Sequence, residues 1–231
     1  MTFELSSELA VVRDRARALA ASLKSAAAAI DRDGVIADSV VDEARRLLSD
    51  DLLTLVIAAE ELAVGSAAAA IDATSGSRKA EPFGLSGLRG AAKLEAGPRS
   101  QLTLAAVALV IGRSALDAAI AELRASKTVA GADVEKPHWV IADAATELEA
   151  ARLLTYKAAK SASDGDIAIA RLMATNAAKS AVDAALRVAG ADALKEGSVL
   201  ERLSRDVRAV ALVMGTEEQQ RAVAAAAVLP L

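Results

Sequence analysis

Few residues of this chain have side chains suited to acid–base or nucleophilic chemistry. The sequence has no cysteine and one histidine, His138, which excludes thiolate catalysis and metal sites built from several histidines or cysteines. Glu60 and Glu61 are adjacent carboxylates, but neighbours on a helix point about 100° apart and do not face one site. His138 stands alone between Pro137 and Trp139, where a surface histidine at a helix start is expected, although imidazole is a common general base.

A segment near the end of the chain has the clearest pattern. Residues 200–221 read LERLSRDVRAVALVMGTEEQQR, which predicts a helix, a tight turn and a second helix. The simplest interpretation of its charges is structural, as an ion pair on a helix surface, a turn and helix caps. Around the turn the segment places Arg205, Asp206, Met214, Gly215, Thr216, Glu218 and Arg221.

The elements that must position these residues are helices. Hydrophobic residues make up 54% of the 231 residues and aromatic residues only 2%, so the core must be built from Ala, Leu, Val and Ile. Alanine favours helices, and small side chains let helices approach one another closely. No strand-like alternation is found, and we therefore predict an all-α fold.

The predicted helices fall into two groups. Glycine and proline are concentrated in residues 74–98, which hold five of the thirteen glycines and two of the four prolines, as is typical of turns and linkers. We therefore predict an N-terminal helical unit over 1–74, a connector over 75–98 and a C-terminal up-down bundle of four to five helices over 99–231. Helices are predicted over 8–30, 38–48, 52–72, 99–126, 138–163, 167–188, 198–213 and 217–228.

The order and spacing of these segments resemble the acyl-CoA dehydrogenase family. FELSSELAVVRDRARALA and DLLTLVIAAEELAVGSAAAA resemble two N-terminal helices of that family. RSALDAAIAELRASK, ATELEAARLLTYKAA and the closing RD…GT…QQR follow the order of its C-terminal four-helix bundle. In the family the two helical blocks flank a β-barrel-like domain that faces the flavin. The resemblance therefore implies a truncated, degenerate member in which the connector replaces the β-domain.

The resemblance also implies that the catalytic base of the family is missing. The glutamate that precedes Gly-Thr in the family, and removes the α-proton of the acyl thioester, corresponds to Met214. Some members carry the base on the first bundle helix, at the position of Ser100, and the arginine beside it corresponds to Gln101. Methionine cannot accept a proton, and serine without an adjacent base is a poor base. We expect no catalytic residue of the family type.

The anchors for FAD, the cofactor of the family, are largely absent as well. The family's arginine and Phe-Gly after the first bundle helix correspond to residues 126–130, which contain neither. Its Gln-x-x-Gly-Gly-x-Gly, which receives the adenosine end from a neighbouring subunit, corresponds to residues 186–192, where Gly190 remains. A dinucleotide anchor needs arginine charge and close backbone approach. We expect no FAD and no metal, with Gly190, Thr216 and Glu218 as the remaining candidates for cofactor contacts.

Charge and hydropathy limit the kinds of partner that this protein is expected to have. The net charge is −4 with both signs interspersed, so we expect no nucleic acid. No run of about 18 residues is both apolar and free of charge, and the N-terminus lacks the pattern of a signal peptide. We therefore expect a cytoplasmic protein without a membrane span.

Two functions remain open. Members of the family assemble through the bundle, and helix faces left uncovered by a missing domain need a partner. The first function is that of a structural or regulatory subunit, as a homo-oligomer or beside a full-length acyl-CoA dehydrogenase. The second is an active or accessory enzyme that binds an acyl-CoA, either an acyl-CoA oxidoreductase or a flavin-free enzyme acting on the thioester with Glu218 or His138 as acid or base. Arg152, Lys157 and Lys160 either contact a CoA phosphate or face solvent.

Overall fold

The structure, a computed structural model, describes residues 5–75, 85–125 and 135–229. Within these ranges the chain forms nine α-helices and one short 3-10 helix, and contains no strand. The all-α fold predicted from the sequence is thereby confirmed. The helices are α1 (Ser7–Asp33), α2 (Asp38–Leu47), α3 (Leu52–Gly65), α4 (Ala67–Thr74), α5 (Pro98–Ala125), α6 (Glu135–Ser161), α7 (Asp164–Ala189), η1 (Ala191–Leu194), α8 (Val199–Leu212) and α9 (Glu217–Val228).

Most helices begin at a side-chain cap. The hydroxyl of Ser6 accepts a hydrogen bond from the N–H of Leu9 at 3.3 Å, and this bond starts α1. Each such cap contributes about 1 kcal/mol because it satisfies a backbone N–H that the helix itself leaves free. At its other end α1 stops at Gly34, whose φ of 66° is readily adopted by glycine. Equivalent caps are made by Asp51, Ser66, Ser163, Ser198 and Thr216.

The single helix predicted over 52–72 is wrong, because the chain breaks it into α3 and α4 at Ser66. Ser66 has an extended backbone with φ −157°, and its hydroxyl accepts a hydrogen bond from the N–H of Ala69 at 3.2 Å. Just before it, a Cβ on Gly65 would lie 2.4 Å from the carbonyl oxygen of Ala20. The glycine therefore lets α3 end directly against the backbone of α1, and the serine starts a new helix.

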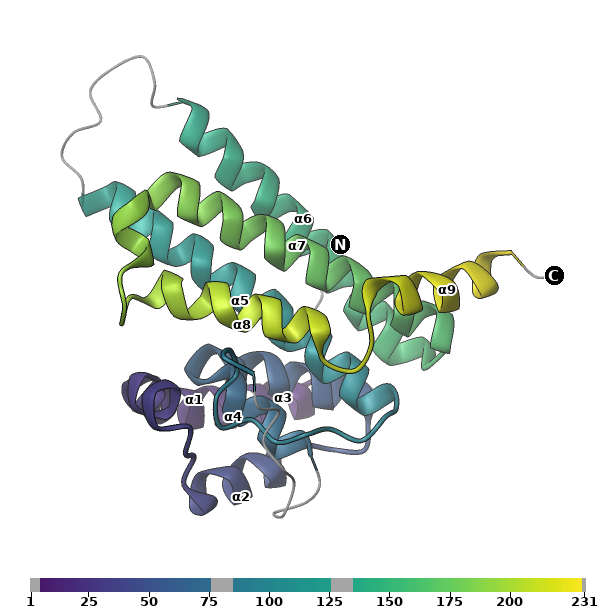
Figure 1. Ribbon diagram of the computed structural model, residues 1–231. Coiled ribbons are helices and arrows are strands. Elements are labelled where there is room, and N and C mark those ends of the chain that lie inside the picture. Colours follow the sequence, from purple (N-terminus) through teal and green to yellow (C-terminus); the bar gives the residue numbers. More distant parts are fainter. Residues whose placement is uncertain (1–4, 76–84, 126–134, 230–231) are drawn as a thin grey trace.

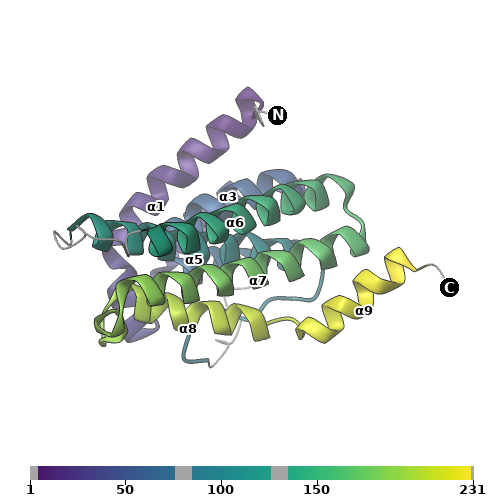
Figure 2. The ribbon, with the colours of Figure 1, turned by 90° about the horizontal axis from the view of Figure 1, so that it is seen from above.

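The helices form two layers (Figure 1). One layer contains α5–α8 and the other contains α1–α4. Helix α5 joins the layers, because it packs against α3 and α4 on one side and against α6, α7 and α8 on the other. Figure 2 shows that the N-terminal part of α1 extends away from this body, and that α9 lies at its edge. Helix α9 packs on α7 and has no buried residue.

Small residues bring α5, α6 and α7 close together. A Cβ on Gly112 of α5 would lie 2.8 Å from Leu148 Cδ2 of α6 and 3.0 Å from the Cα of Ala178 of α7. Ala178 and Ala181 of α7 are fully buried. This is the alanine-built core that the composition predicts.

The described part of the connector, residues 85–97, is packed and not free. Leu88, Ala91 and Leu94 are buried in the main hydrophobic core. A Cβ on Gly87 would lie 2.4 Å from the carbonyl oxygen of Arg205 of α8. The connector thus holds both layers, although the domain bounds given above stay a prediction.

Helix α5 is long and has an extended apolar stretch. Its residues Pro98–Arg124 are long and apolar enough to cross a membrane when up to two charged residues are allowed in an 18-residue window. Within the structure, 61% of that window is buried. The core helices of soluble proteins meet the same criterion, and the position of α5 between the two layers accounts for its composition.

Candidate functional site

The turn between α8 and α9 contains the residue at the family's base position. Met214 has φ 63° and Gly215 has φ 114°, so two residues with positive φ form the short turn between α8 and α9. Thr216 then caps α9, because its hydroxyl accepts from the N–H of Gln219 while the Gln219 side chain accepts from the N–H of Thr216 at 2.8 Å. The predicted turn and cap are confirmed, and both hydrogen-bonding groups of Thr216 are used within the chain.

The start of α5 lies against this turn. The side-chain amide of Gln101 donates a hydrogen bond to the carbonyl of Met214 at 3.0 Å. Ser100, the alternative base position, is next to it and only 5% exposed. The structure therefore brings the start of α5 and the Met214 turn into contact through Gln101.

The acidic residues that follow the turn are engaged elsewhere. Glu217 accepts a hydrogen bond from Lys179 of α7 and pairs with Arg221 at 2.9 Å, and the Lys179 bond is the main reason that its pKa is lowered. The side chain of Glu218 is 81% exposed and lies 4.0 Å from Arg221. A hydrogen bond with its own backbone N–H lowers its pKa. A carboxylate with a lowered pKa is a weaker base.

A buried arginine that was not predicted from the sequence binds the last carbonyls before the turn. Arg171 of α7 is 3% exposed and donates to the carbonyls of Val210 and Val213, the latter at 3.3 Å, and to the hydroxyl of Thr175. Burial lowers the pKa of Arg171 to about 10. Carbonyls at a helix C-terminus carry partial negative charge, so this cation suits the end of α8. The sequence signal is a charge inside an apolar run, IAIARLMAT.

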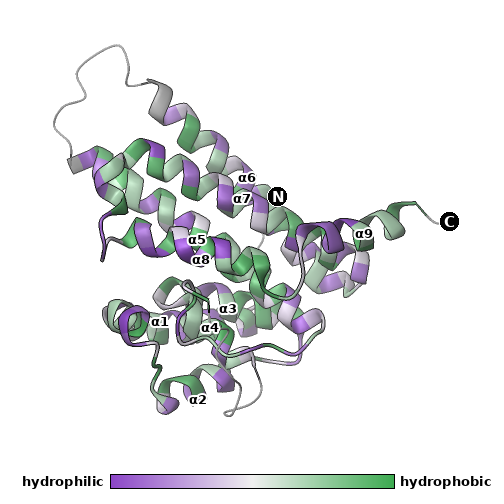
Figure 3. Cartoon of the chain, in the orientation of Figure 1, coloured by the Kyte–Doolittle hydropathy of each residue, from purple (hydrophilic) through white to green (hydrophobic). Residues whose placement is uncertain are grey.

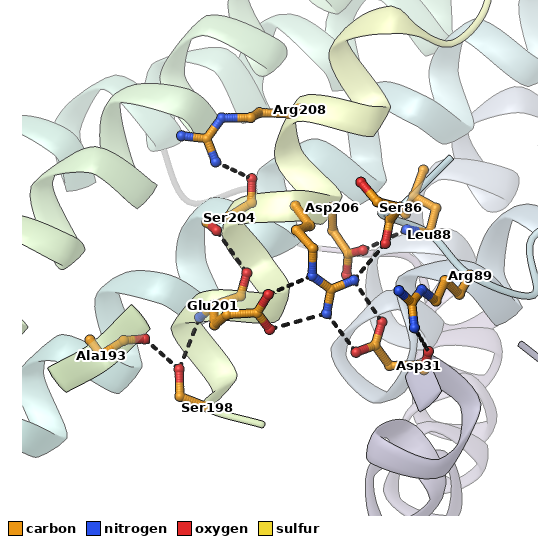
Figure 4. A network of polar contacts seen from close by, with 11 residues as sticks. Asp31, Ser86, Leu88, Arg89, Ala193, Ser198, Glu201, Ser204, Asp206 and Arg208 are labelled. Carbon is orange, nitrogen blue, oxygen red and sulfur yellow. Dashed lines mark hydrogen bonds and ion pairs between the residues drawn. The ribbon is translucent and has the colours of Figure 1, made fainter. Parts of the chain in front are cut away.

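Arg205, in the middle of α8, joins three parts of the chain (Figure 4). Its guanidinium donates to Glu201 at 2.6 Å, to Asp31 of α1 at 2.6 Å and to the carbonyl of Ser86 in the connector at 2.6 Å. These hydrogen bonds raise the pKa of Arg205, the one to Glu201 most. The expectation of a plain ion pair on a helix surface is therefore wrong, because Arg205 is held by both layers.

Asp206, beside Arg205, is buried and faces the connector. Its Oδ1 accepts a hydrogen bond from the N–H of Leu88 at 2.6 Å. Burial raises its pKa to about 6, although the bond from Leu88 opposes this shift. The residue fixes the backbone of the connector and is 7% exposed.

The remaining candidates lie on different faces of the molecule. Glu60 is buried against α6, where its Oε2 accepts from the Tyr156 hydroxyl at 2.6 Å and pairs with Arg152 at 3.1 Å. Burial raises the pKa of Glu60, against the opposing effect of Arg152. Glu61 points instead to Arg17 of α1 at 2.7 Å. The two glutamates thus diverge, as their spacing predicts.

Most of the aromatic and basic residues of α6 named above are exposed or bound within the chain. Tyr156 is 5% exposed, and its hydroxyl binds a buried glutamate. Trp139 is 62% exposed, and His138 beside it is exposed as well, as expected for a histidine at a helix start. Lys157 pairs with Asp166 at 2.8 Å. Arg152 and Lys157 are therefore bound to carboxylates of the chain.

Two of the candidates for cofactor contacts, Thr216 and Glu218, are poorly suited to a pyrophosphate. The third, Gly190, ends α7 with open space around its Cα. Thr216 is committed to its cap, and the exposed Glu218 carboxylate would repel a pyrophosphate. Residues 126–130 lie outside the described ranges. In the part of the chain that the structure covers, no group of three or more acidic or histidine side chains is placed to hold a metal.

Comparison with known proteins agrees with the sequence pattern. Residues 98–229 match the family model "Acyl-CoA dehydrogenase, C-terminal domain". No curated protein matches the chain. Solved structures are similar to nearly the whole chain at low sequence identity, and this similarity shows the fold alone. Three examples follow.

These three structures have different names and the same helical arrangement. A glutaryl-coenzyme A dehydrogenase in complex with glutaryl-CoA has a TM-score of 0.84 and 17% identity, over 100% of this chain and 97% of that chain. Butyryl-CoA dehydrogenase from Megasphaera elsdenii has a TM-score of 0.81 and 17% identity, over 99% and 100%. A nitrososynthase from Micromonospora carbonacea var. africana has a TM-score of 0.79 and 15% identity, over 99% and 98%. Because the family model covers more than half of its residues, the chain belongs to the acyl-CoA dehydrogenase family.

Proposed function

We propose that this protein is a catalytically inactive acyl-CoA dehydrogenase-like subunit of the cytoplasm. It does not oxidise acyl-CoA by itself, and it acts as a structural or regulatory partner, as a homo-oligomer or together with a full-length family member. The observation that carries the proposal is the Met214 turn. Its carbonyl is bound by Gln101, and Thr216 is used by the cap of α9.

The first step of the argument is chemical. Removal of a proton beside a thioester carbonyl needs a base within hydrogen-bonding reach of that proton. The two family positions for this base carry the thioether of Met214 and the hydroxyl of Ser100. The nearest glutamates along the chain are paired with Lys179 and Arg221. A flavin that could accept the hydride has no fitting anchor among the described residues.

The second step concerns assembly. Several large hydrophobic side chains are exposed on helices of the bundle, including Trp139 at 62%, Leu153 at 50% and Val223 at 44%. Figure 3 shows that the C-terminal part of α9 is largely hydrophobic, although this helix has no buried residue. Exposed apolar surface of this kind is favoured at contacts between proteins. This supports a second subunit covering α9, either another copy or a full-length relative.

An accessory enzyme that binds an acyl-CoA has less support. His138 lies at the start of α6 and Glu218 at the start of α9, so the two proposed acid–base groups lie on separate helices. Both are exposed, and the pKa of Glu218 is lowered. The structure offers no water-excluding site around either residue, within the part that it describes.

The test is to assay the purified chain and a Met214→Glu variant. We expect neither protein to retain FAD, and neither to reduce an electron-accepting dye with butyryl-CoA or glutaryl-CoA, even with added FAD. The variant restores only the base, so it should fold with a change in unfolding free energy of about 1 kcal/mol or less and stay inactive. Stoichiometric FAD together with dye reduction by the unmodified chain would contradict the proposal.

Assembly is tested by light scattering during size-exclusion chromatography. We expect a mass of at least two chains, or a stable complex after mixing with a full-length acyl-CoA dehydrogenase. A single-chain mass that persists in both experiments would overturn the assembly part. A Val223→Glu variant, which places a charge on the exposed side of α9, should reduce the mass, whereas the matched change Val11→Glu on α1 should not.

A further inference from the structure

A cavity of about 530 Å3 lies between the two layers, at a distance from the Met214 turn. It is bounded by α1, the junction of α3 and α4, the connector, the middle of α5 and the first half of α8. Its lining residue Ile111 is eleven residues from Ser100, about 16 Å along α5. Figure 4 shows Asp31, Leu88 and Asp206, which form part of its lining. The volume is within the range of small-molecule sites.

The inner wall of the cavity is apolar and made of short side chains. Ala63 and Ala67 come from the α3–α4 junction, and Ile111 and Ala118 from α5. The backbones of α1 and α3 are already in contact at Gly65. These two helices therefore cannot move closer together to fill the cavity. A ligand would therefore meet an apolar surface on this side.

Carboxylates that line the cavity already have partners. Asp31 is paired with Arg205, and Asp117 lies 3.4 Å from Arg113. Asp206 accepts the hydrogen bond from the Leu88 N–H. Because these carboxylates are already bound within the protein, they do not favour a cationic ligand.

The cations of the lining are less engaged. Arg89 donates to the backbone carbonyl of Asp31 at 3.3 Å. The side chains of Lys24 of α1 and Arg202 of α8 make no hydrogen bond or ion pair with any residue in the described ranges, and Arg202 acts on Asp206 only through its charge. Two unpaired cations from different layers thus border one cavity, and they favour an anion there.

The start of α4 adds neutral donors on the same side. Ala67 and Ala68 line the cavity, and their backbone N–H groups have no acceptor among the described residues. Such N–H groups at the first turn of a helix carry partial positive charge. The hydroxyl of Ser66 accepts from the N–H of Ala69, which leaves its hydrogen free to donate.

We propose that this cavity binds a small organic carboxylate with a short apolar tail. The carboxylate lies between Lys24, Arg202 and the start of α4, and the tail lies on the alanine wall of α5 and the α3–α4 junction. This site is separate from the family's reaction centre and does not depend on the proposed function.

The experiment uses the full chain and hexanoate, with hexan-1-ol as a probe of the same length without charge. We expect calorimetric titration to show hexanoate binding about tenfold more tightly than hexan-1-ol. Arg202→Gln should weaken hexanoate binding by about tenfold. The matched control is Arg208→Gln on the same helix, which should leave binding unchanged because Arg208 is bound to the Ser204 carbonyl outside the cavity. Ala118→Leu, which fills the cavity, should abolish binding.

A measurement on the unmodified protein keeps the proposal testable if a variant fails to fold. On addition of hexanoate, the amide resonances of Ala67 and Ala68 should shift, and that of Gly215 should not. Equal binding of hexanoate and hexan-1-ol would overturn the proposal. So would equal loss in the two arginine variants, shifts centred on Gly215, or no binding of hexanoate at about 10 mM.

Discussion

The two halves of the family signature lie in the middle of α8 and in the turn that follows it, and they have different contacts. In the middle of α8, Arg205 and Asp206 are bound by α1, by α8 itself and by the connector. In the turn, Met214 is bound by Gln101 of α5, and Thr216 caps α9. The first half joins the two layers, whereas the second half connects the end of α8 to α5 and α9. Both halves make packing contacts in this chain, and we propose that the chemical role of the signature is lost.

The largest effect on stability is expected at Arg205. Arg205→Ala leaves Asp31 and Glu201 without their cation and the Ser86 carbonyl without a donor. Removing one member of a largely buried charge network typically costs about 3 kcal/mol, and urea unfolding should show a loss of that order. The control Arg208→Ala removes one bond within α8 and should cost less than about 1 kcal/mol. Similar losses of unfolding free energy in both variants would show that the contacts of Arg205 with α1 and the connector add nothing to those made within α8.

Asp206 should make the stability of the protein depend on pH. Its pKa is raised to about 6 by burial, so the folded state binds a proton more tightly than the unfolded state. Stability from this residue is therefore present below the unfolded pKa of about 3.9 and is lost as the pH rises through about 6. Asp206→Asn keeps the bond from Leu88 and removes this titration. The difference in unfolding free energy between the two proteins should change by up to about 3 kcal/mol between pH 4 and pH 7. A difference that stays constant over this range would show that Asp206 is not desolvated.

A smaller effect is expected at the turn. Thr216→Ala removes the cap of α9 and should lower its stability by about 1 kcal/mol. The amides of α9 should exchange with solvent faster, while those of α8 keep their rates. Ser180→Ala, at an exposed position of α7, is the matched control and should change neither. If the exchange of α8 also accelerated, the turn would be coupled to the rest of the chain as strongly as Arg205 is.

Local patterns in the sequence predict most of the fold. The helix over 217–228 is predicted with its observed bounds, because the tight turn at Gly215 and Thr216 marks its start. The break between α3 and α4 is not predictable from the apolar pattern, since it depends on the contact of Gly65 with the backbone of Ala20. A contact between distant segments leaves no periodic signal.

The candidate site is predictable only in part. The positions of Ser100, Gln101 and Met214 follow from the resemblance, and the structure brings Gln101 and Met214 into contact. The partners of Arg205 and the burial of Arg171 depend on which helices pack together. Their spacing along the chain contains no such information, because Asp31 and Arg205 are 174 residues apart.

The alanine core around Gly112 has a consequence for how the protein tolerates change. Alanine has no side-chain rotamers, so burying it costs no side-chain conformational entropy, but each residue removes little apolar area from water. Much of the stabilisation must then come from dispersion between helices held close along α5 and α7. A larger residue at Gly112 or Ala178 cannot be accommodated by turning a neighbouring side chain, and it would separate two helices over several turns. We therefore expect this core to be far less tolerant of enlargement than one built from leucine and phenylalanine.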